Sequence, residues 1–327
     1  MENRLKNSRV LVTGGAGFIG SNLVESLLLS GNHVVCLDNF STGRRENLKD
    51  LMTNPEFRLI EGDIRNYDDC VNAVKNIDYV FHQAALGSVP RSIKDPVSST
   101  DVNIGGFVKM LFASKEAGIK RFIYAASSST YGDHPDLPKV EDKIGKPLSP
   151  YGITKFVDEL FASNFASAYH IDVIGLRYFN VFGRKQDPDG AYAAVIPKFL
   201  KLLKAHEAPV INGDGTFSRD FTYIDNVIQA NHLAALAASR EAVNQVYNVA
   251  HGERTDLNSL FKIIQEIAAK YDREILKIKP VHGPERAGDI PHSLASVEKA
   301  RKLLGYAPTH NVTEGLEEAV EWFWKNL

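Results

Sequence analysis

The chain has 327 residues, 44% of them hydrophobic and 24% charged, and its formal net charge is −2; this composition is ordinary for a globular protein with a sizeable core and gives no sign of a nucleic-acid or membrane-surface partner. The two cysteines form no CxxC pair and no metal-ligand spacing occurs, so we expect neither a disulfide framework nor a metal site. No run approaches the roughly 18 apolar residues of a membrane span, and the first residues lack the shape of a signal peptide, so we expect a cytoplasmic protein.

Short apolar runs alternate with helical stretches through the first half of the chain. The runs predicted to be buried strands are 8–13, 33–38, 57–60, 79–83, 122–126 and 173–178. Helical spacing is found between them, for example over 18–29, 102–117 and 152–169. This alternation predicts a parallel sheet covered on both faces, and right-handed crossovers then give a doubly wound α/β fold.

The regular alternation of strands and helices ends after Gly183, where prolines and glycines surround one predicted helix over 196–204. A seventh strand is predicted over 244–250, and further helices over 257–271, 297–304 and 313–324. We therefore predict two domains. A dinucleotide-binding domain comprises residues 1–183 plus about 221–252, and a smaller α/β lobe comprises 184–220 plus about 253–327.

A glycine-rich turn, TGGAGFIG, joins the first predicted strand to the first predicted helix. Gly14, Gly17 and Gly20 have the spacing of a tight turn that lets a pyrophosphate approach the backbone and the helix N-terminus. Asp38 ends the next strand, where an acid can hold the adenosine ribose diol and repel a 2′-phosphate. The pattern predicts an NAD site, although the glycines alone also suit any α/β helix start. Asp63 follows the third strand, where it either contacts adenine or caps a helix.

A serine run and a Tyr-x-x-x-Lys pair are the candidate reactive groups. Ser127 to Ser129 follow the fifth strand, at the sheet edge where open α/β proteins bind ligands. Tyr151 and Lys155 face the same way if this segment is helical. A lysine ammonium and a cationic nicotinamide both favour a tyrosine phenolate, whose ordinary pKa of ~10 is too high for a base. The trio predicts acid/base chemistry on an alcohol carbon; a turn cap and a surface pair are the alternatives.

Motifs along nearly the whole chain carry a resemblance to a known family: TGGAGFIG, DNFSTG, HQAA, SSSTYG, YGITK, LRYFNVFG and RDFTYIDNV. In combination they resemble the extended short-chain dehydrogenase/reductase family and, within it, the nucleotide-sugar 4-epimerases. The resemblance implies a Rossmann-like NAD domain with a substrate lobe, and catalytic roles for Ser127, Tyr151 and Lys155. It implies NAD contacts at Gly14, Gly17, Phe18, Ile19, Gly20, Asp38, Asn39, Asp63, Ile64, Ala84, Asn103, Lys155 and Tyr178.

The resemblance also implies a set of substrate contacts, with a UDP group held in the smaller lobe. These are Gly87, Ser88, Arg91, Ser127, Ser128, Ser129, Tyr151, Asn180, Gln186, Val195, Val210, Asn212, Arg219, Arg286, Asp289 and Ser293. Dehydratase relatives carry an acid just after the active serine or threonine, where this chain has Ser-Ser-Thr at 128–130. The missing acid favours an epimerase over a dehydratase or a decarboxylase.

Two features indicate the sugar. Ser293 is small where relatives restricted to UDP-glucose hold a tyrosine, and LGSVPRS at 86–92 resembles epimerases of N-acetylated sugars. We expect interconversion of UDP-N-acetylglucosamine and UDP-N-acetylgalactosamine, for use in a surface polysaccharide. UDP-glucose and UDP-galactose are alternatives, as is UDP-N-acetylglucosaminuronic acid, whose carboxylate Arg91 could meet. A non-catalytic NAD-binding regulator is the alternative from another class.

The resemblance further implies a homodimer. Helices 102–117 and 152–169 pair with a second subunit in relatives, but their apolar faces are equally suited to packing on the sheet.

Overall fold

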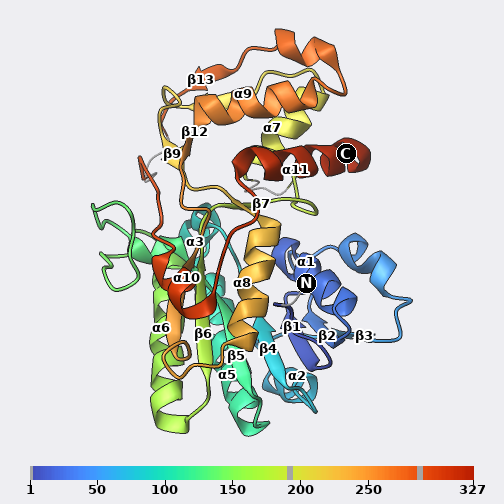
Figure 1. Ribbon diagram of the computed structural model, residues 1–327, viewed down its shortest axis with the longest axis vertical. Coiled ribbons are helices and arrows are strands. Elements are labelled where there is room, and N and C mark those ends of the chain that lie inside the picture. The colour runs from blue at the N-terminus through green and yellow to red at the C-terminus, as the bar shows by residue number, and fades with distance from the viewer. Residues whose placement is uncertain (1–2, 190–193, 286–289) are drawn as a thin grey trace.

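The computed structural model describes residues 3–189, 194–285 and 290–327. Its centre is a seven-stranded sheet, in the order β11-β6-β5-β4-β1-β2-β3, in which every paired neighbour is parallel (Figure 1). The strands are β1 (Arg9–Thr13), β2 (His33–Asp38), β3 (Phe57–Glu61), β4 (Tyr79–His82), β5 (Arg121–Ser127), β6 (Val173–Tyr178) and β11 (Gln245–Val249). The predicted doubly wound α/β fold is confirmed, with the predicted seventh strand at the sheet edge.

Helices cover both faces of this sheet. They are α1 (Phe18–Leu29), α2 (Tyr67–Ala73), α3 (Val89–Lys94), α4 (Pro96–Thr100), α5 (Phe107–Glu116), α6 (Pro150–Tyr169) and α8 (Ile224–Leu236). Alternate side chains of β1 enter two different cores: Val10 and Val12 join the cluster under α1 and α8, whereas Leu11 joins the cluster under α2, α5 and α6. Burial on both faces explains why the strands are continuous apolar runs rather than alternating ones.

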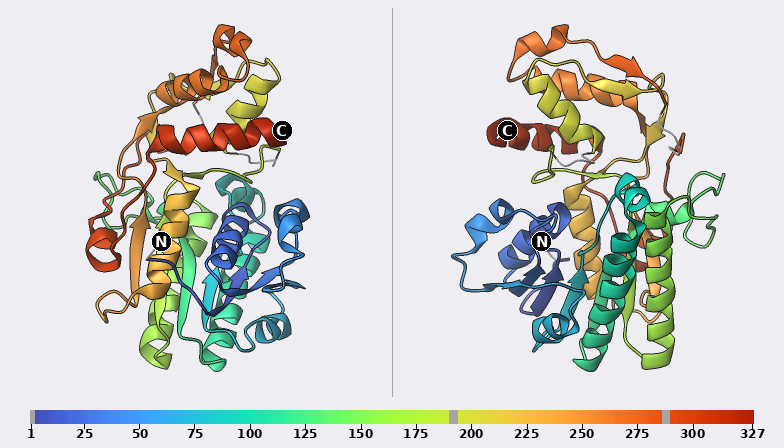
Figure 2. Two further views of the ribbon diagram at one scale, coloured as in Figure 1. Left: turned by 45° about the vertical axis from the view of Figure 1, so that its right-hand side comes forward. Right: turned by 180° about the vertical axis from the view of Figure 1, so that it is seen from behind.

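A smaller layer lies above one end of the sheet, as the views in Figure 1 and Figure 2 agree. It contains α7 (Val195–Lys204), α9 (Leu257–Ala268) and α11 (Val312–Asn326), with α9 packed on both α7 and α11. Three short strand pairs lie with them: β7 (Val181–Phe182) with β10 (Thr222–Tyr223), β8 (Val210–Asn212) with β13 (Val281–Gly283), and β9 (Ser218–Arg219) with β12 (Thr255–Asp256).

Short helical turns complete the described elements: η1 (Arg45–Leu51), η2 (Asp101–Gly106), η3 (Ser128–Tyr131) and η4 (Arg273–Lys277). The stretch predicted as one helix over 102–117 is divided, because its first part is the π-helical η2 and only the second is α5. The last short helix, α10 (Glu298–Leu304), packs on β11 and α8 although its residues were assigned to the smaller lobe. The domain boundaries stay a prediction. Within the described residues no helix has the length and hydropathy needed to span a bilayer.

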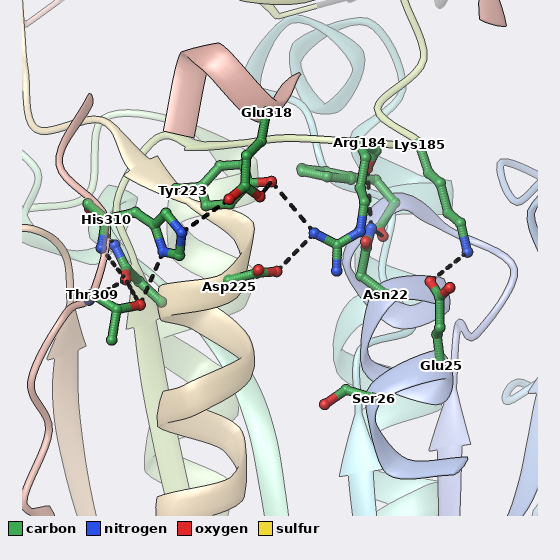
Figure 3. A network of polar contacts seen from close by, with 12 residues as sticks. Asn22, Glu25, Ser26, Arg184, Lys185, Tyr223, Asp225, Thr309, His310 and Glu318 are labelled. Atoms are coloured by element: carbon green, nitrogen blue, oxygen red, sulfur yellow. Dashed lines mark hydrogen bonds and ion pairs between the residues drawn. The ribbon is translucent and has the colours of Figure 1, made fainter. Parts of the chain in front are cut away.

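A polar network joins the smaller layer to the sheet (Figure 3). Arg184, just after β7, donates to Asp225 on α8 at 2.8 Å, and Tyr223 donates to Glu318 on α11 at 2.7 Å. Asp225, His310 and Glu318 bring possible metal-ligand atoms within 4.8 Å of one another. Both carboxylates are already engaged by these donors, and the network links the smaller layer to α8.

Candidate active site

In the turn between β1 and α1, glycines allow neighbouring backbone segments to approach each other closely. Gly14 has φ +67°, and a Cβ there would lie 2.7 Å from the Cα of Ala84. A Cβ on Gly20 would lie 2.1 Å from the carbonyl oxygen of Gly14. Gly17, the N-cap of α1, provides no side-chain cap, so the first N–H groups of the helix are left for a ligand. The turn therefore has the form of a cradle for a pyrophosphate.

A cavity of about 500 Å³ opens over this cradle, at the carboxyl ends of the sheet strands. It is lined by all the predicted cofactor residues except Asn103, namely Gly14, Gly17, Phe18, Ile19, Gly20, Asp38, Asn39, Asp63, Ile64, Ala84, Lys155 and Tyr178. Residues contributed by distant parts of the sequence thus meet at one sheet edge, the place where open α/β folds bind ligands.

Asn103 does not line the cavity but supports its wall. The side chain is 1% exposed. Its Oδ1 accepts the N–H of Leu86 at 2.7 Å, and its Nδ2 donates to Thr154 at 3.1 Å. A direct cofactor contact of Asn103 stays a prediction; in this structure its polar atoms hold the backbone at Leu86.

Asp38 and Asp63 are the two predicted cofactor residues with a carboxylate, and both line the cavity. The carboxylate of Asp38 accepts the N–H groups of Ala16 and Phe40, both at 2.8 Å. Burial raises the pKa of Asp38, and these two N–H groups act against the increase. Arg65 bonds Asp63 and lowers the pKa of that carboxyl to about 2.

The alternative role for Asp63, a helix cap, is wrong. The N-cap of α2 is Asn66, whose side chain accepts the N–H of Asp68. Asp63 instead receives a side-chain hydrogen bond from Asn39 at 2.8 Å, so two of the predicted cofactor residues support each other.

Ser127, Tyr151 and Lys155 converge on the wall of the same cavity. Ser127 ends β5, and its Oγ accepts the N–H of Ser129 at 3.1 Å, so it caps a turn and also faces the cavity. Tyr151 and Lys155 lie one turn apart on α6, whose N-cap is Ser149. The Tyr151 backbone is fixed in turn by Ser92, whose Oγ accepts its N–H at 3.0 Å. The structure thus brings together the three groups that the sequence singled out.

Lys155 is buried below this wall, with 2% of its surface exposed. Its Nζ donates to the carbonyl of Ala125 on β5 at 3.0 Å and to Asp158 at 3.2 Å. Sequence reasoning missed Asp158. Its position three residues after Lys155 on a predicted helix was the available signal.

A second cavity of about 270 Å³ lies in the smaller layer. Asn180 and Val181 line both cavities. The second cavity is also lined by four of the predicted substrate residues: Val195, Val210, Asn212 and Arg219. Arg219 donates to the carbonyls of Ser218 and Pro291 at 3.0 and 3.1 Å.

The other predicted substrate residues have varied surroundings. Gly87 and Ser128 line the first cavity. Outside the lining of both cavities are Ser88, Ser129, Arg91, Gln186 and Ser293. Ser88 caps α3 by accepting the N–H of Arg91, and the Nε2 of Gln186 donates to the carbonyl of Val181. Arg286 and Asp289 lie outside the described residues.

Arg44 and Asp187 line the first cavity although the sequence did not identify them as site residues. Arg44 comes from the loop after β2 and Asp187 from the loop after β7, and their side chains pair at 3.2 Å. No local pattern could have revealed this contact, because it joins segments 143 residues apart.

The fold and the site define a doubly wound nucleotide-binding enzyme with a Ser-Tyr-Lys trio beside its dinucleotide cradle. Residues 10–250 match the NAD dependent epimerase/dehydratase family, and the chain belongs to that family. Its cofactor is NAD. The glycine cradle and the acid at the end of β2 are the features of this structure that fit it.

Three relatives illustrate the similarity. A UDP-N-acetylglucosamine 4-epimerase from Methanobrevibacter ruminantium, solved in complex with UDP-N-acetylmuramic acid, is 39% identical with a TM-score of 0.91, over 99% of this chain and 100% of the other. A UDP-glucuronic acid 4-epimerase from Bacillus cereus, in complex with UDP-glucuronic acid and NAD, is 32% identical with a TM-score of 0.88, over 98% and 100%. A UDP-glucose 4-epimerase of Mycolicibacterium smegmatis is 35% identical over 96% of this chain and 98% of its own length.

Proposed function

We propose that this protein is an NAD-dependent UDP-sugar 4-epimerase that interconverts UDP-N-acetylglucosamine and UDP-N-acetylgalactosamine. The observation that carries this proposal is the convergence of Ser127, Tyr151 and Lys155 on the wall of the dinucleotide cavity. That cavity meets the second cavity at Asn180 and Val181, which gives a nucleotide sugar a place next to the cofactor.

The chain's own groups supply the proton transfers of this reaction. Tyr151 takes the proton of the C4 hydroxyl as the carbon is oxidised, and returns it when the 4-keto sugar is reduced on its other face. Ser127 donates a hydrogen bond to the same oxygen, and the Lys155 ammonium favours the phenolate. Bound NAD would supply the group that reversibly accepts the hydride of C4. Residues 128–130 carry no acid for eliminating water, which favours epimerisation over dehydration.

The second cavity suits the uridine diphosphate. Val195 and Val210 offer apolar contact for a base, and Asn212 offers polar groups. Arg219 and Asn180 line the same space, where a guanidinium and an amide can bond phosphate oxygens. Arg286 and Asp289 are proposed to complete this subsite on the strength of the family resemblance alone.

The acetylated sugar is favoured by two features of the sequence, the small Ser293 and the 86–92 segment, and by the name of the Methanobrevibacter ruminantium relative. Other relatives are named for UDP-glucose or UDP-glucuronate. UDP-glucose and UDP-N-acetylglucosaminuronic acid are therefore the second candidates for the substrate.

Turnover measured side by side on the three UDP-sugars tests the assignment. We expect the highest kcat/KM for UDP-N-acetylglucosamine, and faster conversion of UDP-glucose would refute the choice. Ser293→Tyr should reduce turnover of the acetylated sugar more than that of UDP-glucose.

Tyr151→Phe, which keeps the ring in place, should retain NAD and lose ~10²–10⁴-fold in turnover. A Tyr151→Phe enzyme of normal activity would remove Tyr151 from the acid/base role.

We also infer that the protein works as a homodimer. Apolar side chains remain exposed on α5 and α6, which lie side by side (Figure 2). They include Phe112 at 37%, Ile153 at 50%, Leu160 at 53% and Tyr169 at 44% exposure. Large apolar side chains exposed on two neighbouring helices are typical of an interface between subunits.

A further inference from the structure

Asp158 is a fully buried carboxyl group on α6, one turn after Lys155. Its side chain is 0% exposed. Its Oδ2 lies 3.2 Å from the Nζ of Lys155, while its Oδ1 is buried with no hydrogen-bond partner among the described residues. A buried carboxyl with one unsatisfied oxygen costs folding free energy rather than supplying it. Stability therefore does not explain why this residue is an acid.

The ammonium of Lys155 is held by two contacts from below the cavity. An ammonium has three N–H donors. One is used by the carbonyl of Ala125 and one by Asp158, at 3.0 and 3.2 Å. The third is left for the cavity that Lys155 lines together with Tyr151. Asp158 thus fixes the direction in which the lysine presents its charge.

Several titratable and charged groups surround this pair, and they come from four elements of the fold. They are Lys155 and Glu159 on α6, Tyr124 on β5, Arg177 on β6 and His82 on β4. Glu159 is neutralised by Arg177, which bonds both of its oxygens at 2.8 and 2.7 Å.

The two remaining neighbours are uncharged. Burial, assisted by the Lys155 charge, lowers the pKa of His82 to about 3, so its imidazole is neutral. Burial raises the pKa of Tyr124 well above its ordinary value, so its phenol is neutral too. The charges of Asp158 and Lys155 are therefore balanced mainly by each other.

We propose that Asp158 is a positioning residue for the epimerase reaction, which holds the Lys155 ammonium against the cavity wall and influences, through its negative charge, how turnover depends on pH. This role rests on the proposed function of Tyr151 and Lys155. Asp158 touches neither the cavity nor the sugar, since it is absent from the lining residues of both described cavities. It acts through Lys155.

The negative charge of Asp158 determines the direction in which the pH profile of turnover should move when this residue is replaced. Burial raises the pKa of Asp158 to about 7, and Lys155 acts against that increase, so the group is a carboxylate above about pH 7. This carboxylate, 3.2 Å from the Nζ of Lys155, makes proton loss from the lysine and from the neighbouring phenol less favourable. Replacing it by a neutral amide removes that effect, so the part of the turnover profile above about pH 7 should move to lower pH, by on the order of one unit for a single charge.

The test compares wild type, Asp158→Asn and Asp158→Glu as full-length proteins with bound NAD. Turnover of UDP-N-acetylglucosamine is measured from pH 5 to 10. We expect the part of the Asp158→Asn profile above about pH 7 to move to lower pH, with at least a tenfold lower maximum, and the Asp158→Glu profile to keep the wild-type position. A merely structural role would lower the rate without moving the profile. Superimposable profiles, or a shift to higher pH, would overturn the inference.

A second readout does not depend on the substrate assignment. Tyrosinate absorbance is titrated in the NAD-bound proteins, and the signal missing from Tyr151→Phe is assigned to Tyr151. Its midpoint should be lower in Asp158→Asn than in wild type, and an unchanged midpoint contradicts the inference. If wild type epimerises no UDP-sugar, the proposed function fails, and this titration still decides the role of Asp158.

Discussion

The buried side chain of His232, on α8, connects the N-terminal segment, α1 and α8. Its Nδ1 accepts the N–H of Leu5 at 3.1 Å, and its Nε2 lies 3.0 Å from the Oγ of Ser26 on α1. A backbone N–H can only donate, so Nδ1 carries no proton and the neutral imidazole is protonated on Nε2. Burial lowers the pKa of His232 to about 4. The N-terminal segment, α1 and α8 therefore depend on an uncharged histidine.

This histidine should make the fold sensitive to acid. Because its folded-state pKa lies below the unfolded value of 6.5, the unfolded chain takes up the proton first as the pH falls. The contribution is complete above pH 6.5 and is lost between there and about pH 4, by about 3 kcal/mol. His232→Gln keeps a donor and an acceptor, so its free energy of unfolding should fall less with acid over this window.

Urea unfolding at pH 7 and pH 4 measures the difference. His282→Gln is the matched control, since His282 is exposed. An equal loss of stability with acid in wild type and His232→Gln would contradict the prediction.

At the scale of elements, the β1–turn–α1 unit has the closest backbone contacts of the site. Gly20 lies against the carbonyl oxygen of Gly14, and Gly14 lies against Ala84 at the end of β4. Three elements are thus held at distances that leave no room for a methyl group, and the first N–H groups of α1 keep their aim into the cavity.

Gly20→Ala should therefore separate the turn from the helix. The added Cβ would lie 2.1 Å from the Gly14 oxygen, so backbone has to move. We expect bound NAD to fall at least ~10-fold together with turnover, because the same N–H groups hold the pyrophosphate. Gly105→Ala is the control, as its Cβ would meet Asp101 at an ordinary 3.5 Å. Gly20→Ala protein with full NAD content would refute the role of this turn.

At the scale of the whole molecule, the cofactor cavity and the smaller layer are joined by the loop after β7. Its Arg184 pairs with Asp225 on α8, and Lys185 pairs with Glu25 on α1 at 3.0 Å (Figure 3). Asp187 of the same loop reaches Arg44 across the cavity lining. The loop thus ties the smaller layer to α1 and α8 and to the loop after β2, which keeps the two cavities adjacent.

The proposed dimer is tested at this scale. Ile153 and Leu160 are exposed on α6 at a spacing of seven residues, so they lie on one face. Light scattering should give the mass of two chains for wild type and of one chain for Leu160→Arg. Leu29→Arg on α1, at a site with 79% exposure, should remain dimeric. A monomeric wild type would refute the homodimer.

Much of this architecture could be predicted from the sequence, because its signals are local. The strand runs, the glycine spacing and the Tyr151–Lys155 interval each lie within a few residues, and the structure brings them to one cavity. The supporting contacts could not be predicted. Asn103 bonds Leu86, and Arg44 pairs with Asp187, only because the crossovers bring distant segments together. The spacing of apolar residues over 102–117 also gave no sign that the first part of this helical stretch is a π-helix.

In the proposed reaction, the carbon at C4 of the sugar is oxidised and then reduced with its own hydrogen, beside Tyr151. Its most direct test uses UDP-N-acetylglucosamine carrying deuterium at C4, converted in ordinary water by the NAD-bound protein. We expect UDP-N-acetylgalactosamine that keeps the deuterium at C4, with no net change in NAD. Replacement of that deuterium by hydrogen from water would contradict it.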